Sequence, residues 1–245
     1  MTGKSHIEWT EMTWNPVTGC TKVSPGCKYC YAETLAGRLQ AMGVHGYENG
    51  FAVSLIPERL ELPKRRKTPT IWFVNSMSDL FHDKVPFAYV DKVMATITTT
   101  PQHIYQILTK RPKVMAKYFA GRSVPNNAWL GVTVEDRRYG TPRIAPLRSI
   151  RAPIRFLSVE PLLEDVGALD LESIHWVIVG GESGTKARPM APEWARNIRD
   201  QCARNNVPFF FKQWGAHGVD GQRRAKGRNG RLLDGVVHDA MPELC

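Results

Sequence analysis

Three of the five cysteines lie in one short stretch, residues 19–32 (GCTKVSPGCKYCYA), which we call the cysteine loop. Six residues separate Cys20 from Cys27, and two separate Cys27 from Cys30. Three thiols are one ligand short of a closed tetrahedral metal site. In a reducing compartment, clustered cysteines point to metal or redox chemistry rather than to disulfides. The loop is therefore a candidate metal site with an incomplete set of protein ligands.

Zinc is the main alternative for these thiols, and it needs a nearby fourth Cys or His. His6 and His45 are the nearest histidines, and neither has a standard finger spacing. A thioredoxin-like pair formed by Cys27 and Cys30 is disfavoured, because this CxxC does not open a helix after the first strand of a βαβ unit.

A second set of polar residues follows short apolar runs at regular intervals. Its carboxylates are Glu135, Glu160 and Glu182. Such carboxylates perform acid–base steps or hold substrate hydroxyls and amides, and we take these three as candidate catalytic residues. The alternative is salt bridging, for which Arg137, Arg155 and Arg188 are the candidate partners.

The elements that must position these residues alternate between apolar runs and amphipathic segments. Strands are predicted at residues 12–18, 70–76, 103–110, 129–136, 154–161, 174–182 and 207–214. Helices are predicted at residues 32–43, 86–97, 112–121 and 192–206, with Pro86 as a first helical residue. Runs that are apolar on both faces and separated by helices indicate a parallel sheet covered on both sides.

The fold predicted from this rhythm is α/β, a partial (β/α)6-type open barrel with parallel strands over residues 1–214. A doubly wound sheet is the second candidate, because periodicity does not separate the two. Residues 215–245 form a basic Gly/Arg-rich extension, either a flap or a mobile arm; the apolar residues in LLDGVV favour the flap. In such folds, reactive residues gather at the carboxyl ends of the strands.

Bulk composition fits a globular cytoplasmic protein. The 245 residues are 42% hydrophobic and 23% charged, and no apolar run is long enough to span a membrane. The N-terminal residues lack the apolar core of a signal peptide. A net charge of +10 favours a polyanionic partner such as nucleic acid. Cys202 falls on the apolar face of a predicted helix and is assigned to the core rather than to hydrogen-atom donation; Cys245 is terminal and incidental.

The cysteine loop resembles the radical SAM superfamily. That superfamily usually has three residues in the first gap and two in the second, with an aromatic before the third cysteine, here Tyr29. The six-residue first gap is similar to that of a phage-associated branch of the superfamily. A more distant similarity is to spore photoproduct lyase.

The resemblance implies that Cys20, Cys27 and Cys30 hold three irons of a 4Fe–4S cluster and leave the fourth open for S-adenosylmethionine (SAM). An electron from a flavodoxin- or ferredoxin-type donor would then cleave SAM. The 5′-deoxyadenosyl radical formed would remove hydrogen from a substrate.

The resemblance also implies SAM contacts at matching positions. Around the third cysteine these are Tyr29 and Tyr31. The superfamily often binds the methionine amino group with a Gly-Gly-Glu sequence after the second strand, where this chain has Ser76, Ser78 and Asp79 as substitutes. Lys110 and Thr133 resemble positions that touch the SAM carboxylate and ribose in spore photoproduct lyase. Gly180-Gly181-Glu182 lies on a later strand, and there its bare backbone could meet adenine or the substrate.

The predicted substrate is a nucleic acid or nucleotide, with DNA repair or base modification as the activity. Two basic clusters are candidates for gripping phosphates: Arg65, Arg66 and Lys67, and Arg223, Arg224, Lys226, Arg228 and Arg231. Two alternatives stay open. The first is radical modification of a peptide or small metabolite, and the second is a zinc-stabilised nucleic-acid-binding module without catalysis.

Overall fold

The computed structural model describes residue 5 and residues 7–243. His6 and Cys245 lie outside the described residues, so the roles considered for them above stay predictions. The chain forms two compact units. Unit 1 comprises residues 1–23, 30–131 and 149–153, and unit 2 comprises residues 24–29, 132–148 and 154–245. A separate domain beginning at residue 215 remains a prediction.

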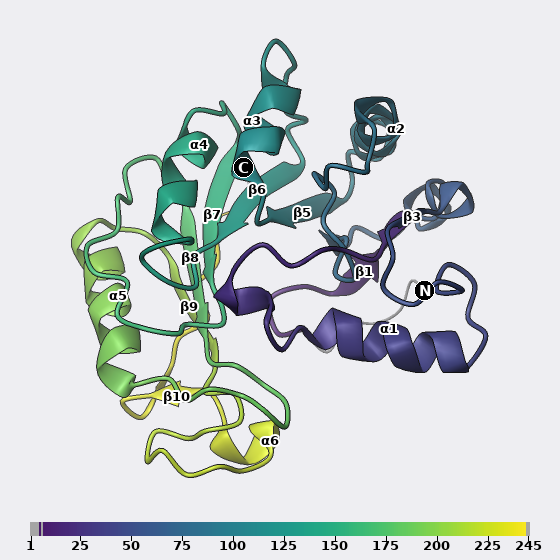
Figure 1. The fold of residues 1–245 in the computed structure, drawn as a ribbon. Coiled ribbons are helices and arrows are strands. Elements are labelled where there is room, and N and C mark those ends of the chain that lie inside the picture. The colour runs from purple at the N-terminus through teal and green to yellow at the C-terminus, as the bar shows by residue number, and fades with distance from the viewer. Residues whose placement is uncertain (1–4, 6, 244–245) are drawn as a thin grey trace. The chain divides into compact units, whose positions relative to one another are not determined.

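Seven strands form the main sheet (Figure 1). In sheet order they are β1 (Met12–Trp14), β4 (Ile71–Val74), β5 (Ile104–Thr109), β6 (Ala128–Thr133), β7 (Ile154–Val159), β8 (Trp176–Gly180) and β9 (Phe209–Gln213). Within unit 1, β1–β4 and β4–β5 pair in parallel, and within unit 2, β7–β8 and β8–β9 do so. The order follows the chain without reversal, whereas a doubly wound sheet reverses at a switch point. The predicted partial β/α barrel is confirmed, and the doubly wound alternative is wrong.

The predicted opening strand, residues 12–18, is wrong as a single element. It divides into β1 and β2 (Val17–Thr18), and β2 pairs antiparallel with β3 (Ser54–Leu55). Pro16 between them has no N–H to donate to a neighbouring strand, and its carbonyl instead accepts from Ile56 N (2.8 Å). The chain therefore leaves the main sheet just before the cysteine loop.

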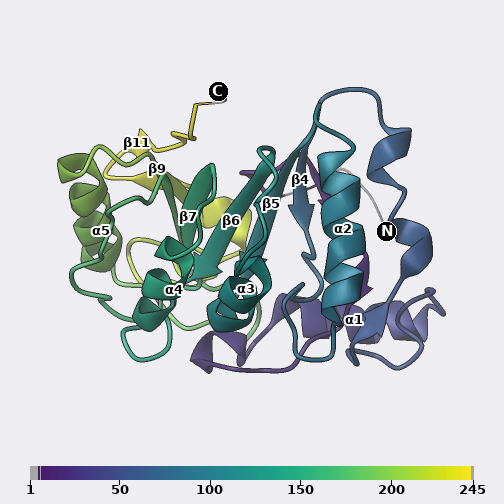
Figure 2. The same cartoon turned by 90° about the horizontal axis from the view of Figure 1, so that it is seen from above.

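Three α-helices belong to unit 1: α1 (Tyr31–Ala41), α2 (Phe87–Thr98) and α3 (Pro112–Phe119). The predicted apolar face of α2, formed by Val90, Val93, Met94 and Ile97, is buried. Pro86 is the N-cap of α2 rather than its first residue. The Tyr118 hydroxyl of α3 donates to Asp91 of α2 (2.7 Å). This hydrogen bond joins the two helices, whose ribbons are seen in Figure 2.

Unit 2 contains α4 (Ile144–Arg148), α5 (Pro192–Arg204) and α6 (Lys226–Asn229). On α5, Ile198 and Cys202 are fully buried, so the assignment of Cys202 to the core is confirmed. Burial raises the pKa of the Cys202 thiol to about 12. The described part of the chain also has four short 3-10 turns: η1 (Pro25–Cys27), η2 (Pro57–Arg59), η3 (Pro63–Arg65) and η4 (Thr141–Arg143).

The basic extension folds back on unit 2 as a small hairpin, β10 (Leu232–Leu233) and β11 (Val236–Val237) (Figure 1). The Trp214 indole N–H donates to the Leu232 carbonyl (2.8 Å). The Phe211 N–H donates to the His238 carbonyl (2.9 Å). Leu233 is fully buried. Within the described residues, no helix has both the length and the apolar character needed to cross a membrane.

Candidate metal and ligand site

The first cysteine is fixed by a close approach of two backbone segments in unit 1. Gly19 forms an isolated parallel bridge with Ser78, and its N–H donates to the Met77 carbonyl (3.0 Å). Gly19 has φ +76°, and a Cβ there would lie 2.1 Å from the Ala52 carbonyl oxygen. Cys20 N–H donates to the Phe51 carbonyl (3.1 Å). Glycine is therefore required here, and Cys20 is held beside the segment that leaves β4.

A buried arginine faces the Cys20 sulfur. Arg111 Nη1 lies 3.5 Å from Cys20 Sγ and 3.2 Å from Asp79 Oδ2, and Arg111 Nη2 donates to the Thr21 hydroxyl (2.9 Å). The Arg111 and Asp79 side chains are only 7% and 6% exposed. Burial, followed by the negative charge of Asp79, raises the pKa of the Cys20 thiol, while the positive charge of Arg111 opposes this shift. Arg111 lies at the polar end of a predicted strand, and sequence reasoning gave it no role toward Cys20.

Asp79 is enclosed by donors from the end of β5 and from its own loop. Its Oδ1 accepts from the Thr109 hydroxyl (2.7 Å) and the Phe81 N–H (3.0 Å), and its Oδ2 accepts from the Lys110 N–H (3.1 Å). With Arg111, both carboxylate oxygens therefore have partners. Asp79 and Lys110 follow two neighbouring strands, and the structure brings these two predicted ligand residues together. There Asp79 is the counter-ion of Arg111.

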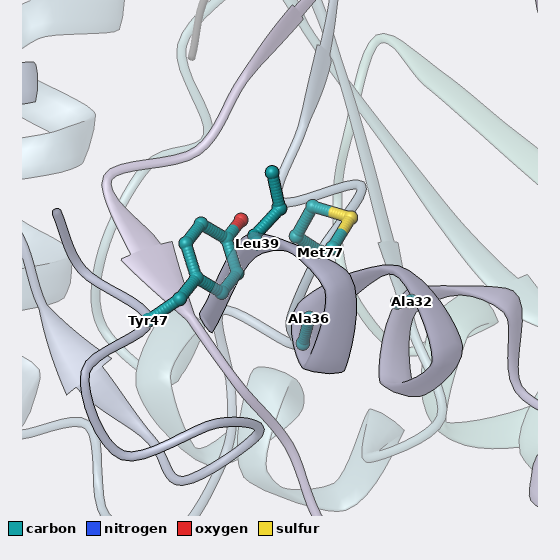
Figure 3. Close-up of a cluster of buried hydrophobic side chains, with 5 residues drawn as sticks. All are labelled: Ala32, Ala36, Leu39, Tyr47 and Met77. Atoms are coloured by element: carbon teal, nitrogen blue, oxygen red, sulfur yellow. The ribbon is translucent and has the colours of Figure 1, made fainter. Parts of the chain in front are cut away.

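The third cysteine begins α1. Cys30 is the N-cap of α1 and packs against a cluster of buried side chains (Figure 3). The members of that cluster are Ala32, Ala36, Leu39, Tyr47 and Met77. Because Met77 comes from the loop after β4, the cluster fixes α1 and its cysteine against that strand end.

Two of the predicted ligand residues near α1, Tyr31 and Ser76, are in contact. The Tyr31 hydroxyl donates to the Ser76 carbonyl (2.5 Å), and the Ser78 hydroxyl donates to the Val17 carbonyl (2.8 Å). Ser76 Oγ is hydrogen-bonded to the side chain of Asn15. Asn75, the residue just after β4, is 3% exposed, and its Nδ2 has no hydrogen-bond partner among the described residues. Asn75 is a buried donor at the strand end where the resemblance places SAM.

In unit 2, Ser24 links the second cysteine to a buried carboxylate. Cys27 ends η1, and its Sγ lies 3.8 Å from the Ser24 hydroxyl, which in turn contacts Glu135 Oε1. A Cβ on Gly26 would lie 2.9 Å from the Glu135 Cγ. Glu135 is fully buried and accepts from Arg143 Nη1 (2.5 Å) and Nη2 (3.2 Å). Arg143 Nη1 also donates to the carbonyl of buried Thr133 (2.7 Å).

The other two candidate carboxylates are also paired. Arg188 donates to Glu182 through Nη2 (2.5 Å) and Nε (2.8 Å), and the guanidinium lies 5.3 Å from the centre of the Tyr29 ring. Hydrogen bonding to Glu182 raises the pKa of Arg188. Lys212 Nζ lies 2.7 Å from Glu160 Oε1.

The partners predicted for these carboxylates are only partly right. The Glu182–Arg188 pair matches the salt-bridge alternative. Arg137 instead pairs with Asp165 (3.3 Å), and Arg155 Nε donates to the Ser173 carbonyl. Arg143 and Lys212 were missed, although Lys212 lies near the end of a predicted strand.

The two glycines before Glu182 serve a close packing of backbones. A Cβ on Gly181 would lie 2.0 Å from the Trp214 carbonyl oxygen, and one on Gly180 would lie 3.2 Å from Glu160 Oε1. The Ala216 N–H donates to the Glu182 carbonyl (2.9 Å). These contacts give a structural reason for glycine at both positions. The predicted contact of this backbone with adenine or substrate stays a prediction.

The three cysteines of the loop are the type of ligand that holds an iron–sulfur cluster. Cys20, Cys27 and Cys30 are free thiols, each partly exposed, and a guanidinium faces one sulfur. Hydrogen bonds to cluster sulfurs are one means by which proteins tune such centres. Cys20 and Cys30 belong to unit 1 and Cys27 to unit 2. Within residue 5 and residues 7–243, no three His, Cys, Asp or Glu side chains already converge on a metal position.

Comparison with known proteins gives a family and a fold. Residues 4–242 match the family model described as "Protein of unknown function (DUF5131)". The chain belongs to this family. No curated protein matches the chain.

Solved structures of spore photoproduct lyase share the fold. A lyase complexed with dinucleoside spore photoproduct is 15% identical with a TM-score of 0.50, over 83% of this chain and 64% of that chain. A mutant lyase with bound AdoMet and dinucleoside spore photoproduct is 14% identical with a TM-score of 0.51 and the same coverage. The chain thus spans about 64% of the length of these lyases.

Proposed function

We propose that this member of the family is a radical SAM enzyme that acts on a nucleic acid or nucleotide. The observation that carries the proposal is the placement of Cys20. Its loop is bridged to the segment leaving β4, and a buried guanidinium faces its sulfur. Three free thiols in one loop provide the ligands, and the fold shared with spore photoproduct lyase supports the proposal.

In this proposal, Cys20, Cys27 and Cys30 hold a 4Fe–4S cluster. When bound, the cluster would supply the electron that cleaves SAM to methionine and a 5′-deoxyadenosyl radical. Arg111 holds Cys20 in place and donates to its sulfur, and Asp79 holds Arg111. Lys110, Thr133, Tyr31 and the serines after β4 remain proposed SAM contacts. We add Asn75, whose Nδ2 has no hydrogen-bond partner among the described residues.

The three carboxylates take different proposed parts. Glu135 supports the turn that carries Cys27, because its carboxylate contacts Ser24 and a Cβ on Gly26 would touch its side chain. Glu160 and Glu182 face cations that would orient them toward a substrate. The net charge of +10 and the basic clusters support the proposed substrate class. A flavodoxin- or ferredoxin-type electron donor and a cytoplasmic location complete the proposal.

Product analysis tests the proposal. Protein purified without oxygen and loaded with iron and sulfide is incubated with dithionite and SAM, and 5′-deoxyadenosine is measured by mass spectrometry. We expect the product from the wild type, and we expect its loss in Cys20→Ala, Cys27→Ala and Cys30→Ala. Cys202→Ala is the matched control and should retain the activity, because Cys202 is buried on α5. A colourless protein that holds one zinc would overturn the proposal in favour of a non-catalytic module.

A further inference from the structure

A surface pocket of about 470 Å³ lies in unit 2 between the loop after β8 and the basic extension. Its lining residues are Ser183, Gly184, Thr185, Ala216, Arg223, Arg224, Ala225 and Lys226. The volume is in the range of pockets that bind small organic molecules. Three of the eight lining residues are cationic and none is acidic, so the pocket suits an anion.

The two arginines of the pocket differ in how far their charge is neutralised. Arg224 donates to both carboxylate oxygens of Asp220, at 2.8 and 2.5 Å, so its charge is compensated. Arg223 Nη2 donates to the Thr185 carbonyl (2.6 Å), and among the described residues Arg223 forms no ion pair. A carbonyl fixes the guanidinium without cancelling its charge. Arg223 therefore keeps donors and a positive charge for a ligand.

One hydroxyl group of the pocket is held by a residue of the sheet. Gln213, at the end of β9, donates through Nε2 to the Ser183 hydroxyl oxygen (3.0 Å). Gln213 is 4% exposed, so Ser183 is anchored by a buried residue. Guanidinium, ammonium and hydroxyl donors around one hollow are the groups that bind phosphate oxygens.

The pocket is continuous in sequence with a candidate catalytic residue. Ser183, Gly184 and Thr185 follow Glu182 directly, and Ala216 N–H donates to the Glu182 carbonyl. We infer that this pocket binds a phosphate group of a nucleotide unit in the substrate, beside Glu182. The inference rests on the proposed function for the identity of that substrate.

Fluorescence anisotropy with a short, fluorescein-labelled single-stranded oligothymidylate tests the inference. The variants are Arg223→Gln/Lys226→Gln, which removes two charges, and Ala225→Trp, which fills the pocket and leaves the charges. We expect each variant to lower the affinity for the oligonucleotide about tenfold. This change corresponds to the loss of one or two charge-assisted hydrogen bonds. For the double variant, the slope of log affinity against log salt should fall by about 0.7, the value for one phosphate contact on a single strand.

Lys113→Gln/Lys117→Gln is the matched control, because it removes two charges from exposed positions of α3 in unit 1. Its loss of affinity should be less than about twofold, the effect of net charge alone. Equal losses in this control and in the pocket double variant would overturn the inference. So would wild-type binding by Ala225→Trp.

Competition identifies the source of the phosphate. Displacement of the oligonucleotide by thymidine 5′-monophosphate but not by thymidine supports a single nucleotide as ligand. Displacement by unlabelled oligothymidylate alone supports the phosphodiester backbone. The assay contains no SAM, so its failure with intact 5′-deoxyadenosine formation would overturn the pocket and leave the proposed function standing. Specific binding without deoxyadenosine would do the reverse.

Discussion

At the scale of single residues, the positions of the candidate carboxylates were easier to predict from the sequence than their ion-pair partners. The sequence predicted that Glu135, Glu160 and Glu182 would stand at strand ends, and each of them has a cationic partner in the structure. Only Arg188 was named as such a partner. Arg143 and Lys212 could not be identified, because pairing depends on how a loop turns back and on which strands are neighbours. Lys212 belongs to β9, and its partner Glu160 follows β7.

Asp79 shows the same limit. Its place at the end of the second predicted strand suggested a ligand for the methionine amino group. The structure surrounds its carboxylate with Thr109, Lys110 N–H and Arg111. A buried guanidinium needs a counter-ion, and no residue spacing in the sequence indicates that Arg111 and Asp79 are buried together.

The ion pair leads to a stability prediction. Asp79→Asn leaves Arg111 buried without a counter-ion, which should lower the free energy of unfolding by about 3–5 kcal/mol. The control is Asp200→Asn, since Asp200 is 51% exposed and its partner Arg199 also pairs with Asp234. The control should lose less than about 1 kcal/mol. Urea unfolding followed by tryptophan fluorescence measures both, and equal losses would contradict the structural role of Asp79.

At the scale of elements, the apolar runs predicted six of the seven sheet strands, β4 to β9, because strands of a parallel sheet are buried on both faces. Every residue of β6 is buried, and so is every residue of β8. Short antiparallel pieces were harder to foresee. β2 and β3 have two residues each and depend on contacts between segments far apart in the sequence. Such pieces leave no periodic signal.

Gly19 connects β2 to the first cysteine, Cys20. Gly19→Ala should destabilise the protein by more than the about 1–2 kcal/mol that a left-handed conformation costs an L-residue, because the new Cβ would meet the Ala52 carbonyl oxygen. It should also reduce the iron bound per chain, since Cys20 is the next residue.

Gly43→Ala is the matched control. Gly43 has φ +64°, and a Cβ there would have no atom within 4 Å, so this variant reports the conformational cost alone. Urea unfolding and iron analysis of both variants check the prediction. The account of the loop would be wrong if the two variants lost equal stability and bound equal iron.

At the scale of the whole molecule, the rhythm of strands and helices indicated a partial barrel, and the strand order bears this out. The two compact units were not foreseen. Their boundary passes through the cysteine loop and through β6, both of which are continuous in sequence pattern. Units of this kind are defined by tertiary contacts, which the local sequence does not encode. The basic extension contributes Arg223, Arg224 and Lys226 to the pocket, so its charge has a defined place in unit 2.

The central claim is that three thiolates hold a cluster with one iron open for SAM. Electron paramagnetic resonance of the dithionite-reduced protein, recorded before and after addition of SAM, tests it most directly. We predict about four irons per chain and a 4Fe–4S signal that changes when SAM is added. Bound zinc in place of iron, or a cluster signal that SAM leaves unchanged, would contradict the account.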